Sequence, residues 1–245
     1  MTSNSEDFQK RGARPSILVF DVNETLLDIE SLAPVFSRVF GDAQVVREWF
    51  GQLVLYSGVV TLSGLYEDFF ALGQGVLRML AGIHKVDIQP SDIEELGTRM
   101  LNMPAHSDVP EGLRLLKDAG FRLVTLTNSP PHPRGSPLER AGIAYFFERQ
   151  FSVDAVRQFK PAPQVYRMVA SMLNAPLGSL CMVAAHVWDT IGAQSTGYSA
   201  ALLTRSGNAP LPVEGLPKPD CIAANLPELA KQLIMFRDQA EALQP

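Results

Sequence analysis

Four short, nearly continuous apolar runs constrain the fold of this chain more than any other feature of its sequence. They read SILVFD, RLVTLT, LCMVAA and SAALLT, at residues 16–21, 122–127, 180–185 and 199–204. Runs of this length are typical of strands that are covered on both faces of a parallel sheet. Helical patterns lie between them, for example at residues 111–119 and 164–173. The alternation predicts an α/β fold with a doubly wound parallel sheet and right-handed crossovers.

The stretch 30–106 departs from this alternation. Its apolar residues follow helical spacing throughout, and none of its runs is typical of a strand. We therefore expect an all-helical domain inserted after the first strand. The predicted organisation is a flexible polar tail at residues 1–13, a core domain formed by residues 14–29 and 107–245, and the helical insertion at residues 30–106.

Composition excludes several classes of protein. The chain has 245 residues, of which 46% are apolar and 19% charged, so it can bury a sizeable core. A net charge of -5, with scattered Lys and Arg residues, argues against a nucleic-acid partner. The N-terminus lacks the apolar stretch of a signal peptide, and no apolar run reaches the roughly eighteen residues of a membrane span. Cys181 and Cys221 lie far apart in apolar surroundings, which favours buried thiols and a cytoplasmic location.

Polar residues gather where the predicted strands end. In an open α/β sheet, ligands bind outside the carboxyl ends of the strands. The residues at these ends are Asp21, Asn23 and Thr25, then Thr127 and Asn128, then His186 and Asp189, with Lys160 in the loop before residues 164–173. Each one alone could be polar because strands emerge into solvent. Together, two acids, a hydroxyl next to an amide and a lysine predict a reactive site at one edge of the sheet.

The same residues resemble the four motifs of the haloacid dehalogenase superfamily. These motifs are a nucleophilic Asp ending the first strand, a Ser or Thr ending the second, a Lys before a helix and an acid after the fourth strand. Here they read FDVNETL, LVTLTNS, FKPAPQVY and MVAAHVWD. Their order and approximate spacing match from about residue 16 to residue 205. The resemblance implies that the core is Rossmann-like and that the helical insertion is a cap, which closes over the site.

Two longer stretches resemble the type II 2-haloacid dehalogenases in particular. They read SVDAVRQFKPAPQVYRMV, from Ser152, and WDTIGAQSTGYSAALLTRSGN, from Trp188. Phosphatases of the superfamily carry a second Asp two residues after the nucleophile, where this chain has Asn23. An amide cannot protonate a leaving alkoxide, and the fourth motif offers a single acid, Asp189. We therefore expect neither a metal nor a cofactor.

The resemblance implies a hydrolase of short 2-haloalkanoic acids that releases a 2-hydroxy acid and halide. Asp21 would displace the halide and form an ester that water then hydrolyses. Halide leaves as a stable anion, so Asn23 is tolerable. The implied catalytic residues are Asp21, Lys160, Asp189, His186 and Thr25, and the implied substrate-binding residues are Val22, Asn23, Thr127, Asn128, Phe50 and Tyr166.

Each role has a physical rationale beside a simpler interpretation. Lys160 would keep Asp21 ionised and help to neutralise the substrate carboxylate, although it could be a surface lysine. Thr25 could orient the Asp21 carboxylate or cap a helix. By resemblance, Asp189 activates or positions water, supported by Lys160 and Tyr166, although Tyr166 could serve helix packing alone. For the aromatic residues Trp49, Phe69 and Phe70, packing within the cap is favoured.

Two positions depart from the best-known members of the type II group. Their halide-binding Arg aligns with Phe50, whose ring edge contacts an anion only weakly; Arg47 could substitute, although a solvent-facing arginine is favoured. Where they carry Ser-Ser-Asn, this chain has Ala184, Ala185 and His186. The alanines remove hydroxyls that would hold water, and the histidine adds an imidazole that can bind or deprotonate water near neutral pH. These changes point to a different substrate range, with smaller halides such as fluoride.

Two other functions stay open at this point. A phosphatase of the same fold, acting on a small phosphate ester with magnesium, shares most of the motifs. A non-catalytic relative that binds a carboxylate metabolite or a protein partner is suggested by the changes at Phe50, Ala184 and Ala185. The expected partner is a small-molecule 2-haloacid, with no nucleic acid and no membrane, and the resemblance also implies a homodimer.

Overall fold

The computed structural model describes residues 15–133 and 135–242, so the predicted tail at 1–13 lies outside the described residues. Its core is a six-stranded sheet, in which every pair of neighbouring strands is parallel, in the order β3-β2-β1-β4-β5-β6. The strands are β1 (Ile17–Phe20), β2 (Arg122–Thr127), β3 (Arg149–Ser152), β4 (Leu180–Ala184), β5 (Ser199–Leu203) and β6 (Cys221–Ala223). The predicted doubly wound parallel sheet is confirmed.

The four apolar runs form the four central strands of this sheet, β2, β1, β4 and β5. Strands β3 and β6 lie at the two edges, and the apolar runs do not predict them. The reason is physical: an edge strand is covered less, and β3 reads RQFS with its first two residues exposed. Strand β6 is only three residues long. Neither strand therefore carries the continuous apolar signal of the central strands.

Strand β1 lies between β2 and β4, with Phe20 opposite Thr125 on one side and Val183 on the other. The chain reaches one neighbour soon after the helical insertion and the other only later, so the strand order reverses at β1. Such a switch point opens a crevice at the carboxyl ends of the strands, where ligands bind in open α/β sheets. Asp21 is the first residue beyond β1, and its backbone N–H donates to Val183 O at 3.0 Å.

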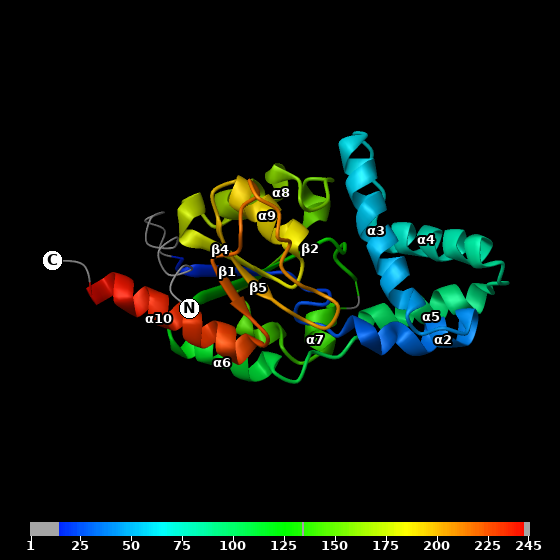
Figure 1. Ribbon diagram of the computed structural model, residues 1–245, viewed down its shortest axis with the longest axis horizontal. Helices are drawn as coiled ribbons and strands as arrows, with labels where there is room; N and C mark the ends of the chain where they lie inside the picture. The colour runs from blue at the N-terminus through cyan, green and yellow to red at the C-terminus, as the bar shows by residue number, and fades with distance from the viewer. Residues whose placement is uncertain (1–14, 134, 243–245) are drawn as a thin grey trace.

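Helices cover both faces of the sheet (Figure 1). One face carries α6 (Val109–Asp118) and α10 (Leu226–Ala242), and the other carries α8 (Pro163–Met172) and α9 (Val187–Ser195). The helices predicted at 111–119 and 164–173 correspond to α6 and α8. Shorter elements are α7 (Pro137–Arg140) and the 3₁₀ helices η2 (Ala144–Phe146), η3 (Val153–Ala155) and η4 (Leu177–Ser179).

The stretch 30–106 is helical, as predicted, and contributes no strand to the sheet. We use the name cap for η1 (Ile29–Leu32), α2 (Ala33–Phe40), α3 (Val45–Leu62), α4 (Phe69–His84) and α5 (Pro90–Leu101). Trp49 and Phe69 are buried and Phe70 is partly buried, so they serve packing as predicted, although Phe69 also packs on Phe159 of the core. The indole N–H of Trp49 donates to the carbonyl of Gly73 at 2.8 Å, so helices α3 and α4 are tied together. The predicted domain boundaries stay predictions.

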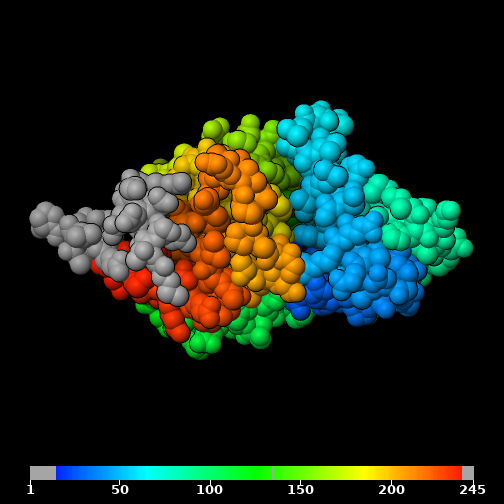
Figure 2. All heavy atoms as spheres, in the orientation of Figure 1, coloured from blue at the N-terminus to red at the C-terminus, as the bar shows by residue number. Residues whose placement is uncertain are grey.

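Helix α3 is one of the elements through which the cap meets the core (Figures 1 and 2). Near its C-terminus, the hydroxyl of Thr61 accepts a hydrogen bond from the backbone N–H of Phe159 at 3.0 Å. Near its N-terminus, Arg47 donates to the carbonyl of Ser206 at 2.8 Å. In Figure 2 the orange loop that follows β5 adjoins the blue cap at this place. The cap therefore contacts the core at both ends of one long helix.

Other expectations have mixed outcomes. Cys181 and Cys221 are free and buried, as predicted. Among the described residues, no helix is long and apolar enough to span a bilayer. The homodimer and the cytoplasmic location stay predictions.

Candidate active site

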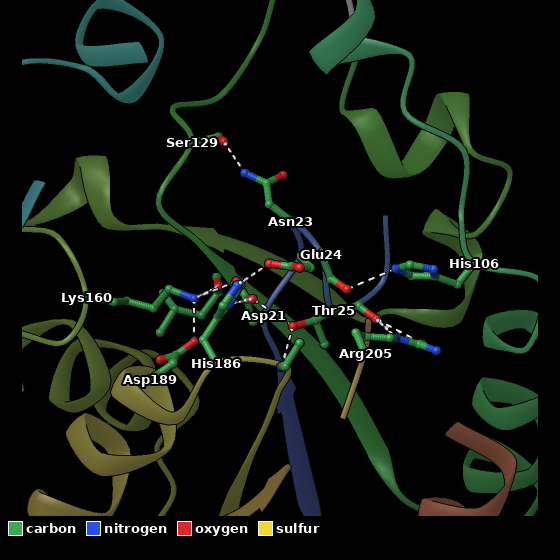
Figure 3. Close-up of polar contacts among 12 residues, drawn as sticks. Asp21, Asn23, Glu24, Thr25, His106, Ser129, Lys160, His186, Asp189 and Arg205 are labelled. Atoms are coloured by element: carbon green, nitrogen blue, oxygen red, sulfur yellow. Dashed lines mark hydrogen bonds and ion pairs between the residues drawn. The ribbon is translucent and has the colours of Figure 1, made fainter. Parts of the chain in front are cut away.

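Asp21 lies at the carboxyl edge of the sheet, only 4% exposed, and both of its carboxylate oxygens are engaged (Figure 3). Oδ1 accepts a hydrogen bond from Nζ of Lys160 at 2.8 Å. Oδ2 accepts one from Oγ1 of Thr25 at 2.7 Å and lies 3.2 Å from Nδ1 of His186. The structure thus brings together four of the five predicted catalytic residues within hydrogen-bond distance of one carboxylate.

The lysine side of Asp21 consists of Lys160, Asp189 and Tyr166. Nζ of Lys160 donates to Asp189 Oδ2 at 2.7 Å and to the carbonyl of Leu126 at 3.0 Å, in addition to Asp21. The other oxygen of Asp189 accepts a hydrogen bond from the Tyr166 hydroxyl at 2.6 Å. Lys160 is 1% exposed, so it is not a surface lysine. Tyr166 does more than pack, because its hydroxyl ties α8 to Asp189.

Close packing of α8 and α9 makes the contact between Tyr166 and Asp189 possible. A Cβ atom at Gly192 of α9 would lie 2.6 Å from the Tyr166 hydroxyl oxygen and 2.5 Å from Cβ of Pro161. Nonbonded heavy atoms do not approach so closely, so a side chain at this position would push the two helices apart. Gly192 therefore sets the spacing that places Tyr166 on Asp189.

The histidine side of Asp21 consists of His186, Glu24 and Arg47. Nε2 of His186 lies 2.6 Å from Oε2 of Glu24, and the other oxygen of Glu24 pairs with Arg47 of helix α3. The imidazole stacks on Trp188 with ring centroids 5.0 Å apart, and Phe50 of the cap lies 5.4 Å from it. Glu24 is in the left-handed region, with φ of 66°, and its carbonyl accepts a hydrogen bond from His106.

Burial and charge fix the protonation states on the lysine side. Burial alone would raise the pKa of Asp21, but Lys160 and His186 outweigh burial and hold that pKa well below its usual range. Burial acts in the opposite direction on Lys160, whose pKa is raised above its ordinary value because Asp189 and Asp21 surround the ammonium. Burial, followed by the charge of Asp189, raises the pKa of Tyr166 well above its ordinary value, so it stays a hydrogen-bond donor.

The two carboxylates beside Lys160 differ. Burial and the neighbouring Asp21 raise the pKa of Asp189, although Lys160 and Tyr166 oppose this shift. Two close carboxylates whose pKa values are driven apart have different chemical roles in many enzymes. Here Asp21 is the more firmly ionised of the pair.

Thr25 and Asn128 hold the loops around Asp21 in place. The Thr25 hydroxyl donates to Asp21 and accepts a hydrogen bond from the backbone N–H of Ala185 at 2.8 Å. The helix that follows in the chain is capped by Asp28, so the alternative that Thr25 caps it was wrong. Oδ1 of Asn128 accepts a hydrogen bond from the backbone N–H of Lys160 at 3.0 Å. Asn128 therefore positions the lysine loop.

The other predicted substrate-binding residues do not all converge. Val22 and Asn23, the two residues that follow Asp21 in the chain, line a cavity of about 250 Å³ together with Thr127. The amide of Asn23 points away from Asp21 toward the Ser129 hydroxyl, 3.4 Å away (Figure 3). Phe50 lies elsewhere, against His186. The predicted substrate-binding residues therefore lie in three places, with Asn128 and Tyr166 on the lysine side of Asp21.

Sequence reasoning missed Glu24 and Arg205 and misjudged Arg47. Arg205 donates two hydrogen bonds to the carbonyl of Thr25, at 3.2 and 3.1 Å, and pairs with Asp108, so it braces the turn after β1. A signal existed, because this arginine lies two residues beyond a fully buried strand. Arg47 is not solvent-facing: its side chain is 26% exposed and also pairs with Glu30.

A second cavity, of about 330 Å³, lies on the far side of Glu24 from His186 and is lined by Glu24, Glu30, Arg47, His106 and Arg205 among others. Its lining mixes cations and carboxylates, most of which are paired with one another. Within the described residues, no group of three or more His, Cys, Asp or Glu side chains is arranged to hold a metal ion.

Known proteins with similar sequences and a similar fold include haloacid dehalogenases. The sequence model of the haloacid dehalogenase-like hydrolases matches residues 15–197. An (S)-2-haloacid dehalogenase from Pseudomonas sp. (strain YL) is 26% identical over 193 residues, covering 78% of this chain and 83% of that protein. One from Xanthobacter autotrophicus is 27% identical over 190 residues, covering 77% and 74%. A solved structure of an L-2-haloacid dehalogenase from the same organism, with chloropropionic acid covalently bound, has a TM-score of 0.80 at 23% identity and covers 89% of this chain and 98% of that one.

Proposed function

The chain belongs to the haloacid dehalogenase-like hydrolases, and from this premise we propose that it hydrolyses the carbon–halogen bond of short 2-haloalkanoic acids. The products are the 2-hydroxy acid and halide. The observation that carries the proposal is the Asp21 carboxylate, buried and held ionised by Lys160 beyond a switch-point strand. The relatives that are named (S)-2-haloacid dehalogenases support hydrolysis of a carbon–halogen bond.

In the first step, the Asp21 carboxylate attacks the carbon that carries the halogen. The carbon–halogen bond breaks, its electron pair leaves with the halide, and an ester forms on Asp21. Thr25 and Lys160 fix the carboxylate for this attack, which reduces the entropic cost of reaching the reactive geometry. The covalently bound chloropropionic acid in the solved relative supports an intermediate of this kind.

In the second step, water hydrolyses the ester. Two residues are candidates for activating the water, Asp189 and His186. Both oxygens of Asp189 are taken, by Lys160 and by Tyr166, and its side chain is fully buried. His186 has a ring nitrogen directed at Asp21 itself. The geometry therefore favours His186 as the base and leaves Asp189 to hold Lys160.

For the substrate, we assign the cavity lined by Val22, Asn23 and Thr127 to the acid's carboxylate, because two of its lining residues follow Asp21 directly in the chain and it offers hydroxyl and amide donors. Phe50 packs against His186, and its apolar ring would line the part of the site that holds the halogen of the substrate. A phosphatase is the weaker candidate, since Asn23 cannot supply a proton to an alkoxide and its amide is directed at Ser129.

The test is halide release from chloroacetate, (S)-2-chloropropionate and fluoroacetate in the presence of EDTA, with Asp21→Asn as the control. We expect release by the wild type that survives chelation and is lost in the variant, together with an ester-sized mass increase on the wild type during turnover. Absence of release from all three acids would overturn the proposal, and magnesium-dependent turnover of phosphate esters would replace it.

A further inference from the structure

We propose that Tyr66 of the cap is a positioning residue for Lys160, because it holds the loop from which that lysine projects. We use the name lysine loop for residues 153–162, between β3 and α8. The inference rests on the proposed function, since it concerns the displacement of halide by Asp21. Tyr66 lies between α3 and α4, outside the four motifs.

Tyr66 contacts the lysine loop at three points. Its hydroxyl donates to Oδ1 of Asp154 at 2.9 Å. Its ring stacks on Phe159 with centroids 5.1 Å apart, and the guanidinium of Arg157 lies 4.7 Å from the centroid of the same ring. One side chain of the cap thus touches both the beginning of the loop and the residue directly before Lys160.

Phe159 joins the cap to the lysine. It is fully buried, its backbone N–H donates to the hydroxyl of Thr61 at 3.0 Å, and the ring of Phe69 lies 6.0 Å from its own. The next backbone N–H, that of Lys160, donates to Oδ1 of Asn128 in the core at 3.0 Å. Two consecutive N–H groups of the loop are therefore bound, one by the cap and the other by the core.

The conformation of the lysine loop depends on support of this kind. Arg157 has a φ of 51°, in the left-handed region that residues with a Cβ atom adopt rarely. Such conformations persist only when the surrounding structure holds them. The contacts of Tyr66 with Asp154 and Phe159 lie on either side of this point in the chain. Without Tyr66 the loop relaxes, and the backbone of Lys160 shifts with it.

A shift of the loop would weaken the hold of Lys160 on the nucleophile. Core side chains bind its ammonium, with Nζ 2.8 Å from Asp21 and 2.7 Å from Asp189. Longer distances would weaken both contacts. Lys160 and His186 are the groups that offset the burial of Asp21, so a displaced lysine lets burial raise the pKa of Asp21 toward its ordinary value. The carboxylate would then be protonated at a pH where the wild type still reacts.

The experiment measures single-turnover halide release from (S)-2-chloropropionate by the full-length enzyme. Tyr66→Leu removes both the ring and the hydroxyl. Its rate at about pH 7 should fall by about 10- to 10²-fold, because a misplacement of about 1 Å can cost about 10²-fold. The rate should halve again near pH 4, as the pKa of Asp21 moves toward about 3.9. The wild-type rate should be constant over this range.

The pH profile separates positioning from support of the cap alone. A cap that is only loosened would slow the reaction by the same factor at every pH, and this result for Tyr66→Leu would overturn the inference. Tyr145→Phe, at a tyrosine of the core that is 70% exposed, is the control and should leave the rate unchanged at every pH.

A milder pair of variants tests the hydroxyl contact and decides the matter if Tyr66→Leu does not fold. Tyr66→Phe keeps the ring and should slow halide release by about fivefold, the factor that corresponds to one ordinary hydrogen bond. In an Asp154→Ala background, Tyr66→Phe should cost nothing more, because the two side chains act as a unit. Additive losses would overturn the inference. A wild-type enzyme that neither releases halide nor forms an ester would overturn the proposed function, and the inference with it.

Discussion

The two sides of Asp21 differ in how they are built. On the lysine side, Lys160, Asp189 and Tyr166 all come from the core domain, and the ion pair of Lys160 with Asp189 is sealed from solvent. On the histidine side, the chain of contacts runs from His186 through Glu24 to Arg47, which belongs to the cap and is a quarter exposed. One carboxylate is therefore held by two networks of different origin.

This difference suggests that the two sides of Asp21 serve different steps of the proposed reaction. A buried lysine between two carboxylates has its charge state and position held by side chains of the core. A base whose partner is tied to the cap can be assembled only when the cap is docked. The lysine side thus suits the displacement of halide, and the histidine side suits the hydrolysis of the ester. Changes to each side should affect different steps.

The largest effect is expected for Lys160→Met. The variant leaves Asp21 and Asp189 buried without their cation, and breaking a buried pair in this way costs about 3–5 kcal/mol. Halide release should be lost, and urea unfolding should show the loss of stability. The control is Lys117→Met, at an exposed lysine that donates to a backbone carbonyl and lies over the Phe146 ring, which should change neither quantity. A stable and active Lys160→Met protein would show that the lysine side does not fix the nucleophile.

A smaller effect, confined to one step, is expected for Arg47→Met. With Glu24 less firmly held, hydrolysis of the ester should slow by about tenfold, less than the roughly 10²- to 10⁴-fold that a general base contributes. The rate of halide release in a single turnover should stay unchanged. Arg38→Met is the matched control, because Arg38 pairs only with cap residues, Asp92 and Glu95. If Arg47→Met slowed both steps equally, the division between the two sides would be wrong.

The smallest effect, no change at all, is expected for halide release between about pH 7 and about pH 4. An ordinary aspartate, with a pKa of about 3.9, would lose about half of its charge by pH 4. Asp21 stays ionised because its pKa is held well below that value. Its contribution to stability is likewise complete above the unfolded-state pKa and is lost only as pH falls toward the lower folded value. Single-turnover measurements after a pH jump test this, and a rate that halves near pH 4 would contradict it.

The sequence predicts the centre of the fold better than its edges. Strands covered on both faces need continuous apolar residues, so β1, β2, β4 and β5 are visible as runs. The edge strand β3 needs only one inward residue, Phe151, which is buried while Arg149 and Gln150 are exposed. No single-sequence pattern distinguishes such a segment from a loop.

In the site, likewise, residues at motif positions are predicted from the sequence, whereas contacts between residues far apart in the chain are not. Asp21, Lys160 and Asp189 occupy motif positions, and the structure brings them together. Glu24 is three residues from Asp21, yet its partners are 23 and 162 residues away along the chain. Arg47 has a helical spacing that fits a solvent-facing position equally well. Pairings over such separations depend on how the cap docks, which local sequence does not encode.

The left-handed backbone at Glu24 has a consequence for protein engineering. A side chain in this region costs roughly 1–2 kcal/mol that glycine would not incur, and the φ of 66° places Glu24 there. A selection for heat tolerance alone would therefore favour glycine at this position and, in doing so, remove the partner of His186. Folding and turnover thus make opposing demands on a single residue, and a thermostable variant obtained without an activity screen is expected to lose turnover there first.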